Sequence, residues 1–210
     1  MRPLQGEPQI HPGETDEFAF RASQDALPAS VDVAIVGGGI VGCSAAYYLA
    51  RAGVSVALFE KGRISGEQSG RNWGWVRQQC RSPIELPLML ESLRLWKSLA
   101  VELGQDLGFH QGGTLYLAES EAELAALGEW LPIARVHGLD TKLMTGRELK
   151  AVFAPGDRFA GALYTASDGR AEPSLATRAI AHGARSAGAR IYSHTAARGV
   201  ETAAGRAAGV

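Results

Sequence analysis

The pattern of apolar and polar positions changes sharply after residue 30. The run over 31–36 is nearly all apolar, which is typical of a parallel strand buried on both faces. Small and apolar residues over 40–51 predict a tightly packed helix that Gly53 ends. A second apolar run over 54–59 leads to Glu60. Strand, helix and strand in this order, over about 30 residues, predict one βαβ unit.

Helical and strand-like patterns alternate along the rest of the chain. A one-faced apolar stripe, formed by Met89, Leu93, Trp96, Ala100 and Leu103, predicts a helix over 84–104. The further expected elements are a strand over 114–118, a helix after Ser120 that Pro132 divides, a capping-box pair at Thr145 and Glu148, a strand over 162–165, a turn at Asp168, a helix from Pro173 to about residue 187, and strands over 189–195 and from Ala207 onward.

The sequence makes a separate prediction for each end of the chain. Residues 1–30 are rich in Pro, Gly and acidic groups and show no periodicity, so they predict an extended arm. The chain stops at Val210 inside an expected strand. Because a half-built strand leaves backbone groups unpaired, we expect a fragment or a truncated gene product.

Composition excludes several classes of protein. The net charge of −1 over 210 residues supplies no basic field for nucleic acid. The apolar runs are far shorter than the roughly 18 residues that a membrane-spanning helix needs. Four acidic groups in the first 20 residues do not fit a signal peptide. Two cysteines, Cys43 and Cys80, build neither a disulfide framework nor a zinc site, and no histidine pair has metal-ligand spacing.

Three glycines between the first strand and the first helix form a G-x-G-x-x-G motif. Gly37 lets the chain turn off the strand, Gly39 lets a pyrophosphate approach the backbone, and Gly42 lets the helix pack closely. The anion is expected at the helix N-terminus, so we count Ile40 among the cofactor contacts. Glu60, at the end of the second strand, fits the ribose hydroxyls of an adenosine and would repel a 2′-phosphate.

The motif leaves two alternatives open. A glycine-rich turn can pack a helix on a sheet without any ligand, although this leaves the strand-end Glu60 unexplained. The motif also does not distinguish FAD from NAD. The sequence that follows Glu60 decides between them.

Several segments resemble the FAD-dependent D-amino-acid oxidase/dehydrogenase family, in particular its glycine-oxidase, sarcosine-oxidase-like and D-amino-acid-dehydrogenase branches. The resemblance runs from about residue 31 to residue 210. The segments that carry it are EKGR at 60–63, SGRNWGWVRQQ at 69–79, QGGTLY at 111–116, GALYT at 161–165 and DGRAEP at 168–173. The SGRNWGW block and the DGRAEP turn are together far more specific than the glycine motif.

The resemblance implies FAD as the cofactor and further contacts to it. The implied contacts are Lys61, Arg63, Ser69, Gly70, Arg71, Asn72 and, through its backbone, Ala197. The implied fold is α/β: a Rossmann-like FAD-binding domain, discontinuous over 31–112 and 166–210 and incomplete, with the start of an α+β substrate domain over 113–165.

The sequence leaves two possible roles open for several other residues. Trp73 and Trp75 point the same way in an extended segment, where they either line a flavin or substrate pocket or pack in the core. Arg71 and Arg77 either serve the site or form surface ion pairs. Cys43 is expected to be a packing residue. His110 is expected near the substrate domain, and His182 and His194 are expected on the surface.

The implied activity is oxidation of the C–N bond of a small amine or amino acid, such as a D-amino acid, glycine, sarcosine or a cyclic imino acid, by hydride transfer to flavin. Oxygen and a quinone both remain open as electron acceptors, and so does an oligomer. No catalytic residue and no metal ligand is assigned. The alternatives are a non-catalytic FAD- or ADP-binding remnant or subunit, and an NAD-dependent dehydrogenase. We expect a cytoplasmic protein, with peripheral attachment to the inner membrane as the alternative.

Overall fold

A computed structural model describes residues 26–210, so the predicted arm over 1–30 lies almost entirely outside the described residues. The α/β expectation is confirmed. In chain order the helices are α1 (Ile40–Arg51), α2 (Leu86–Leu103), α3 (Glu121–Gly128), α4 (Leu131–Val136), α5 (Gly146–Leu149) and α6 (Pro173–Ser186), with 3₁₀ turns η1 (Gln68–Gly70) and η2 (Ala154–Arg158). The strands are β1 (Val33–Val36), β2 (Val56–Phe59), β3 (Trp75–Val76), β4 (Thr114–Ala118), β5 (Thr141–Thr145), β6 (Gly161–Thr165), β7 (Gly169–Arg170), β8 (Arg190–Tyr192), β9 (Glu201–Ala203) and β10 (Arg206–Gly209).

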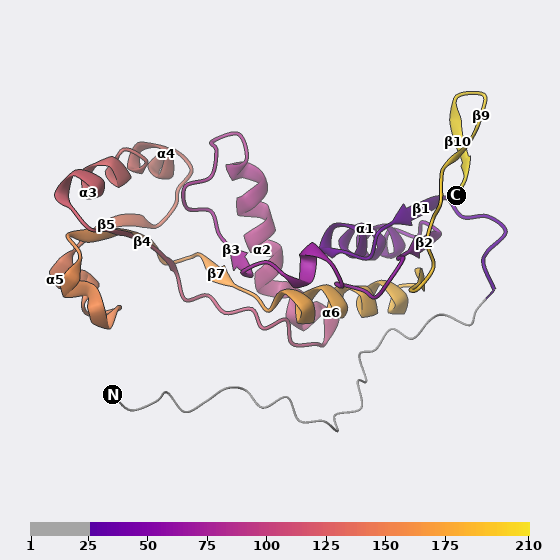
Figure 1. Ribbon diagram of the computed structural model, residues 1–210, viewed down its shortest axis with the longest axis horizontal. Helices are drawn as coiled ribbons and strands as arrows, with labels where there is room; N and C mark the ends of the chain where they lie inside the picture. Colours follow the sequence, from indigo (N-terminus) through magenta and orange to yellow (C-terminus); the bar gives the residue numbers. More distant parts are fainter. Residues whose placement is uncertain (1–25) are drawn as a thin grey trace, which may run out of the picture.

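A parallel sheet of order β1-β2-β8 lies beside helices α1 and α6 (Figure 1). The two helices pack on each other and on the sheet through small residues, among them Ala46, Ala176 and Ala184, which are buried. Side chains of Leu58 and Ile191 complete the same core. Alanine-rich helix faces allow this close approach. The close packing of the helices fixes the position of the loops at the carboxyl ends of the strands.

Strand β1 differs from its expectation. The apolar run predicted a strand buried on both faces, but β1 lies at an edge of the sheet and alternates between half-buried and exposed residues. Val36 is 60% exposed, whereas Val56 of the neighbouring β2 is 2% exposed. The reason is that β1 has only one neighbouring strand within residues 26–210.

A second, antiparallel sheet of order β4-β6-β5 carries α3, α4 and α5 (Figure 1). The predicted caps are present here. Ser120 accepts a hydrogen bond from the Glu123 N–H, and Thr145 and Glu148 form a capping box. Pro132 stands at the start of α4, so it separates α3 from α4 as expected. The domain boundaries at 113 and 165 remain a prediction.

The C-terminal strands correct the sequence expectation. The strand expected over 189–195 is only β8, three residues long, and residues 195–200 have no regular structure. Ala197 lies in that irregular segment and is half-buried. The strand expected from Ala207 is present as β10, but it pairs with β9, which the sequence pattern did not predict. The two strands form a hairpin that projects away from α1 and α6 (Figure 1).

Candidate functional site

The glycine motif forms a tight turn at the carboxyl end of β1. Gly37 has a φ of +110°, a conformation that side chains disfavour. A Cβ on Gly42 would collide with the carbonyl oxygen of Gly37, so the first turn of α1 lies directly on this loop. A Cβ on Gly39 would lie 2.8 Å from the Ser69 hydroxyl oxygen. Gly37 and Gly42 therefore have the turning and close-packing tasks that the motif predicted, Gly39 leaves room for the Ser69 hydroxyl, and a pyrophosphate beside Gly39 stays a prediction.

The N-terminus of α1 is open to an anion. Gly39 caps the helix without a side-chain hydrogen bond, and no acidic residue stands in the first turn. The Ile40 N–H donates to the Ser69 hydroxyl at 2.9 Å, so this side chain lies where the helix dipole is positive. Backbone N–H groups and a hydroxyl at a helix N-terminus are suited to bind phosphate oxygens.

Glu60 lies at the end of β2, is 8% exposed and fixes the glycine turn. Its carboxylate accepts hydrogen bonds from the Gly38 N–H and the Gly62 N–H, both at 2.7 Å. A carboxylate has about four acceptor positions, so two remain for ribose hydroxyls. Glu60 therefore supports the turn itself, and its contact with a ribose stays a prediction.

The charged residues near this turn are paired in the structure. Lys61 and Arg71 both contact the Glu67 carboxylate, at 3.5 and 3.3 Å. All three side chains are more than half exposed, and Arg63 is exposed as well. Such pairs contribute little to stability, so both cations are free to reorient toward an anionic ligand.

Asn72 shapes the loop after η1. Its side-chain amide donates to the carbonyl oxygens of Gln68 and Ser69, and its oxygen accepts from the Gly74 N–H at 2.8 Å. A Cβ on Gly70 would collide with the Ser65 carbonyl oxygen, and Gly74 has a φ of +70°. These residues set the path of the loop that leads from Ser69, beside the glycine turn, to β3.

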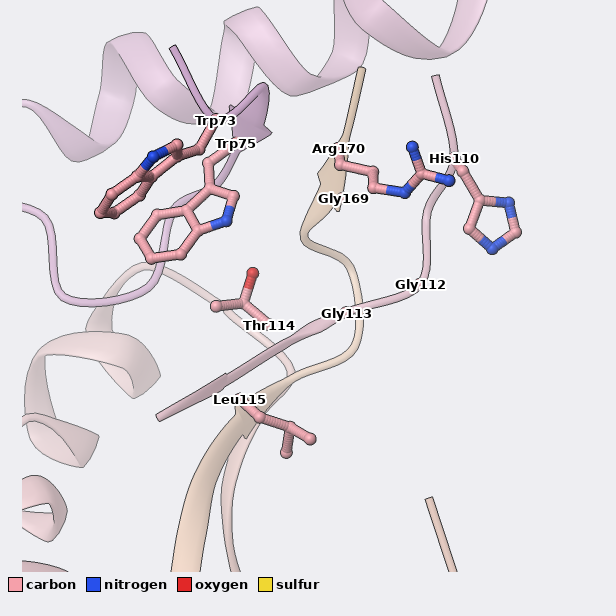
Figure 2. A pocket seen from close by; sticks show the side chains of 9 residues that line it. All are labelled: Trp73, Trp75, His110, Gly112, Gly113, Thr114, Leu115, Gly169 and Arg170. Atoms are coloured by element: carbon pink, nitrogen blue, oxygen red, sulfur yellow. The ribbon is translucent and has the colours of Figure 1, made fainter. Parts of the chain in front are cut away.

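A pocket of about 370 Å³ lies where this loop meets the second sheet (Figure 2). Its lining residues are Trp73, Trp75, His110, Gly112, Gly113, Thr114, Leu115, Gly169 and Arg170. The two indoles meet edge to face, with ring centroids 5.4 Å apart. Trp73 is 82% exposed and Trp75 47% exposed, so the pocket-lining reading holds and core packing does not. On the other side of the pocket, the Arg170 side chain extends toward the His110 ring (Figure 2).

Arg77 supports the aromatic wall of the pocket from behind. Its guanidinium lies 5.1 Å from the centroid of Trp75 and 5.7 Å from that of Tyr116, and it donates to the Gln79 carbonyl oxygen at 2.6 Å. The side chain is half-buried and is not part of a surface ion pair. It connects β3 to the second sheet, a role that the sequence did not reveal.

A buried carboxylate joins the segment after β3 to the turn before β7. Asp168 is fully buried and accepts hydrogen bonds from the Gln78 N–H at 2.7 Å, the Gln79 N–H at 3.2 Å and the Gln78 amide at 3.3 Å. Gln79 in turn donates to the Leu163 carbonyl oxygen at 2.8 Å. Burial raises the pKa of Asp168, and these hydrogen bonds oppose the shift. The sequence showed only a turn signal at this position.

The structure agrees with the expectations for Cys43, His110 and His194 and differs from the one for His182. Cys43 is fully buried, and this burial raises the pKa of its thiol to about 12, which fits a packing residue. His110 lines the pocket as expected, and His194 is exposed. The surface prediction for His182 is wrong, because this residue in α6 is half-buried against the core. Among residues 26–210, no group of His, Cys, Asp and Glu side chains is placed to hold a metal ion.

The sequence model of one family, described as FAD dependent oxidoreductase (DAO), matches residues 32–210. The chain belongs to this family. FAD is the family's cofactor, and the helix N-terminus, Glu60 and Ser69 fit its pyrophosphate and ribose. The recognised resemblance is thereby confirmed, and the NAD-dependent alternative is not supported.

Three relatives illustrate the range of the family. The chain is 32% identical to a glycine oxidase of Bacillus licheniformis over 83% of this chain and 48% of the relative. It is 26% identical to the mitochondrial sarcosine dehydrogenase of Homo sapiens over 83% of this chain and 19% of the relative. The structure of an L-amino acid deaminase from Proteus myxofaciens matches with a TM-score of 0.84 and 32% identity, covering 90% of this chain and 44% of that chain. This chain thus spans about half the length of the glycine oxidase, and less of the sarcosine dehydrogenase.

Membrane spans can be judged only for the described helices. None of the helices within residues 26–210 is both long and apolar enough to cross a bilayer.

Replacing Glu60 by glutamine is expected to raise the Kd for FAD roughly tenfold or more, because hydrogen bonds to a charged acceptor contribute about 1.5–3 kcal/mol each. The glutamine amide can replace only one of the two carboxylate oxygens that now accept N–H groups. Titration of flavin fluorescence measures the change. Glu129→Gln, an exposed position at the end of α3, is the control. Equal Kd values for both variants would contradict the assignment of Glu60.

Replacing Arg77 by leucine is expected to lower the free energy of unfolding by about 1–2 kcal/mol, since two cation–π contacts contribute about 0.5–1 kcal/mol each. Urea denaturation measures this value. The matched control is Arg94→Leu, because Arg94 forms only an exposed pair with Glu91 in α2. Exposed pairs of this kind contribute little to stability. If the two variants lose the same stability, the supporting role of Arg77 is wrong.

Proposed function

We propose that the protein, with FAD bound, oxidises the C–N bond of a small amine or amino acid. One observation supports this most directly: a single loop, from Ser69 to Trp75, begins at the N-terminus of α1 and ends in the aromatic pocket. A dinucleotide needs a phosphate site and, farther along, a pocket for its reactive ring. The loop connects two such places.

The residues of the pocket suit a small amino acid. Trp73 and Trp75 provide an apolar wall against which a flat ring can pack. At the opposite rim, Arg170 supplies a permanent positive charge and His110 a polar ring for a substrate carboxylate (Figure 2). Gly113, whose φ is +82°, lines the same pocket, and a Cβ there would collide with the Tyr164 ring.

The chemistry divides between cofactor and chain. FAD, when bound, accepts the hydride from the substrate carbon. The substrate amine loses a proton as the C=N bond forms, and water then hydrolyses the imine to a carbonyl compound and the free amine. The chain's contribution is to orient the substrate between the indoles and the cationic rim and to keep water from the reacting carbon. Oxygen or a quinone would receive the electrons.

The names of the relatives guide the choice of substrates. Glycine oxidase, sarcosine dehydrogenase and L-amino acid deaminase all act, by their names, on amino acids. We therefore propose glycine, sarcosine, D-amino acids and cyclic imino acids as the first compounds to test. An L-amino acid belongs in the same panel.

The test is an anaerobic titration. The purified protein is expected to be yellow and to hold FAD, and one of these compounds is expected to bleach its flavin absorption. Stoichiometric imine or carbonyl product should appear. Production of hydrogen peroxide on admission of air would identify oxygen as the acceptor.

The competing reading is a non-catalytic FAD- or ADP-binding remnant. It is favoured if the 210-residue chain binds FAD with a stable spectrum that no amine bleaches, even with an artificial electron acceptor present. A chain that stays colourless after FAD addition would refute both readings. Stabilisation against heat by NADH, and not by FAD, would point to a nicotinamide enzyme.

A further inference from the structure

Three neighbouring segments place a row of unlike side chains beside the pocket (Figure 2). Trp75 of β3 pairs with Arg170 of β7, and Arg170 pairs on its other side with His110. The His110 N–H donates to the Arg170 carbonyl oxygen at 2.7 Å, and the Arg170 N–H donates to the His110 carbonyl oxygen at 2.9 Å. Residues directly opposite each other on antiparallel segments project to the same face, with Cβ atoms about 4.5–5.5 Å apart. An indole, a guanidinium and an imidazole therefore form one row.

One end of this row is an aromatic surface. Trp73 meets Trp75 edge to face and is 82% exposed, so residues 26–210 leave most of its ring uncovered. Apolar side chains that line a pocket beside a few polar groups are typical of a ligand site. A ring of a ligand that packs on these indoles would gain free energy from stacking and from the water that it displaces.

The other end of the row is cationic. Within the described part of the chain, Arg170 has no carboxylate partner, and none of the described residues that line the pocket is acidic. A guanidinium without an internal partner can bind a carboxylate through two parallel hydrogen bonds. The row therefore offers a place for a carboxylate next to a place for an apolar ring.

We propose that this row determines the preference for the substrate side chain, and that the protein favours amino acids with an aromatic or another large apolar side chain over glycine and sarcosine. The inference rests on the proposed function. Neighbouring strands lie about 4.8 Å apart. In an amino acid with a ring on its β-carbon, bonds of about 1.5 Å separate the carboxyl carbon from the ring by a similar distance. A carboxylate on Arg170 would thus bring the ring onto the indoles.

Arg77 is the positioning residue of the aromatic surface. It does not line the pocket, but its guanidinium lies 5.1 Å from the centroid of Trp75 and 5.7 Å from that of Tyr116. The rings of Trp75 and Tyr116 meet at 81°, with centroids 6.4 Å apart. Arg77 and Tyr116 together fix the orientation of Trp75, and through it they hold Trp73.

Binding of two simple carboxylates tests the proposal without turnover. 3-Phenylpropionate is phenylalanine without its amine, so it has no C–N bond to oxidise, and propionate is the same acid without the ring. We expect the FAD-loaded chain to bind 3-phenylpropionate about tenfold more tightly than propionate. The indole N–H signals of Trp73 and Trp75 should shift in NMR spectra. Trp96 and Trp130 do not line this pocket, so their signals are the internal controls.

Variants at the two ends of the row separate its two functions. Trp73→Ala changes an exposed side chain, which the fold should tolerate, and should reduce the preference for 3-phenylpropionate over propionate to about twofold or less. Arg170→Gln should weaken binding of both acids about tenfold. Arg94→Gln is its control, because Arg94 contacts only Glu91 in α2, and should change neither affinity.

Variants of Arg77 distinguish positioning from general stability. Arg77→Met should weaken binding of 3-phenylpropionate about threefold and leave propionate unchanged, because only the ring depends on the indoles. Arg77→Lys keeps a cation near both aromatic rings and should restore part of the loss. A purely structural role of Arg77 would weaken binding of both acids equally, and this result would refute its positioning role.

Several results would overturn the proposed preference. These are equal affinities for the two acids, unshifted signals of Trp73 and Trp75, and loss of 3-phenylpropionate binding when FAD is added, which would assign the indoles to the flavin ring. Flavin bleaching that is as fast with glycine as with phenylalanine would uphold the proposed function and refute the preference. Binding of 3-phenylpropionate at the indoles, with a flavin that no amine bleaches, would uphold recognition of an aromatic carboxylate and refute the proposed function instead.

Discussion

Replacing Gly42 by alanine is expected to lower the free energy of unfolding by about 1–3 kcal/mol, although alanine normally favours a helix over glycine. The new Cβ would overlap the carbonyl oxygen of Gly37. A backbone atom cannot rotate away as a side chain can, so either α1 or the turn must shift. The same shift would displace the helix N-terminus, and we expect the Kd for FAD to rise by about tenfold or more.

Urea denaturation and flavin fluorescence titration measure the two effects. Gly199→Ala is the control, because no atom lies within 4 Å of a Cβ at that position. Its stability should stay within about 0.5 kcal/mol of the unmodified protein. A Gly42→Ala protein with unchanged stability and unchanged FAD affinity would show that the turn is not built as described.

Replacing Asp168 by alanine is expected to cost about 3–5 kcal/mol of stability. The change removes the acceptor of three hydrogen bonds from Gln78 and Gln79, and their backbone N–H groups would be left buried without a partner. Because this cluster joins the loop after β3 to the turn before β7, the pocket that Trp75, Gly169 and Arg170 line should also loosen.

The control is Asp106→Ala. Asp106 is exposed and accepts one hydrogen bond, from the Gly108 N–H at 2.8 Å, so its loss should cost only about 0.5–1 kcal/mol. Comparable losses for Asp106 and Asp168 in urea denaturation would refute the buried cluster as the connection between the segment after β3 and the turn before β7.

The pH dependence of the Asp168 variant follows from its pKa. Burial raises the pKa of Asp168 above the ordinary value of 3.8, so the folded protein holds the proton to higher pH than the unfolded chain does. Stability from this group is therefore fully present below that ordinary value and falls as the pH rises through the raised pKa. The stability difference between the unmodified protein and Asp168→Ala should accordingly be largest in acid.

The glycine turn and its acidic neighbour could be predicted because they depend on neighbours in sequence. Gly37, Gly39 and Gly42 are close along the chain, and backbone conformation alone gives them their tasks. Glu60 follows from the same logic, since the carboxyl ends of two paired parallel strands meet at one edge. Local caps, such as Thr145 with Glu148, are equally short-range and were predicted correctly.

The pocket could be predicted only in part. The spacing of Trp73 and Trp75 places the two indoles on one side, but whether that side faces the core or a cavity depends on β7 and the segment after His110, which are distant in sequence. The contacts of Arg77 and Asp168 could not be predicted, because Tyr116 and Gln78, their respective partners, lie far away in the sequence.

The sequence by itself determined the βαβ unit, the glycine turn with its acidic partner and the family, because alternation, small residues and short spacings express local backbone physics. Only the tertiary structure decided that Asp168 is a buried connection, that His182 is half-buried, and that β1 lies at an open edge. Burial and pairing are properties of what surrounds a residue. For β1 the apolar sequence anticipates neighbours on both sides, and residues 26–210 supply a neighbour on one.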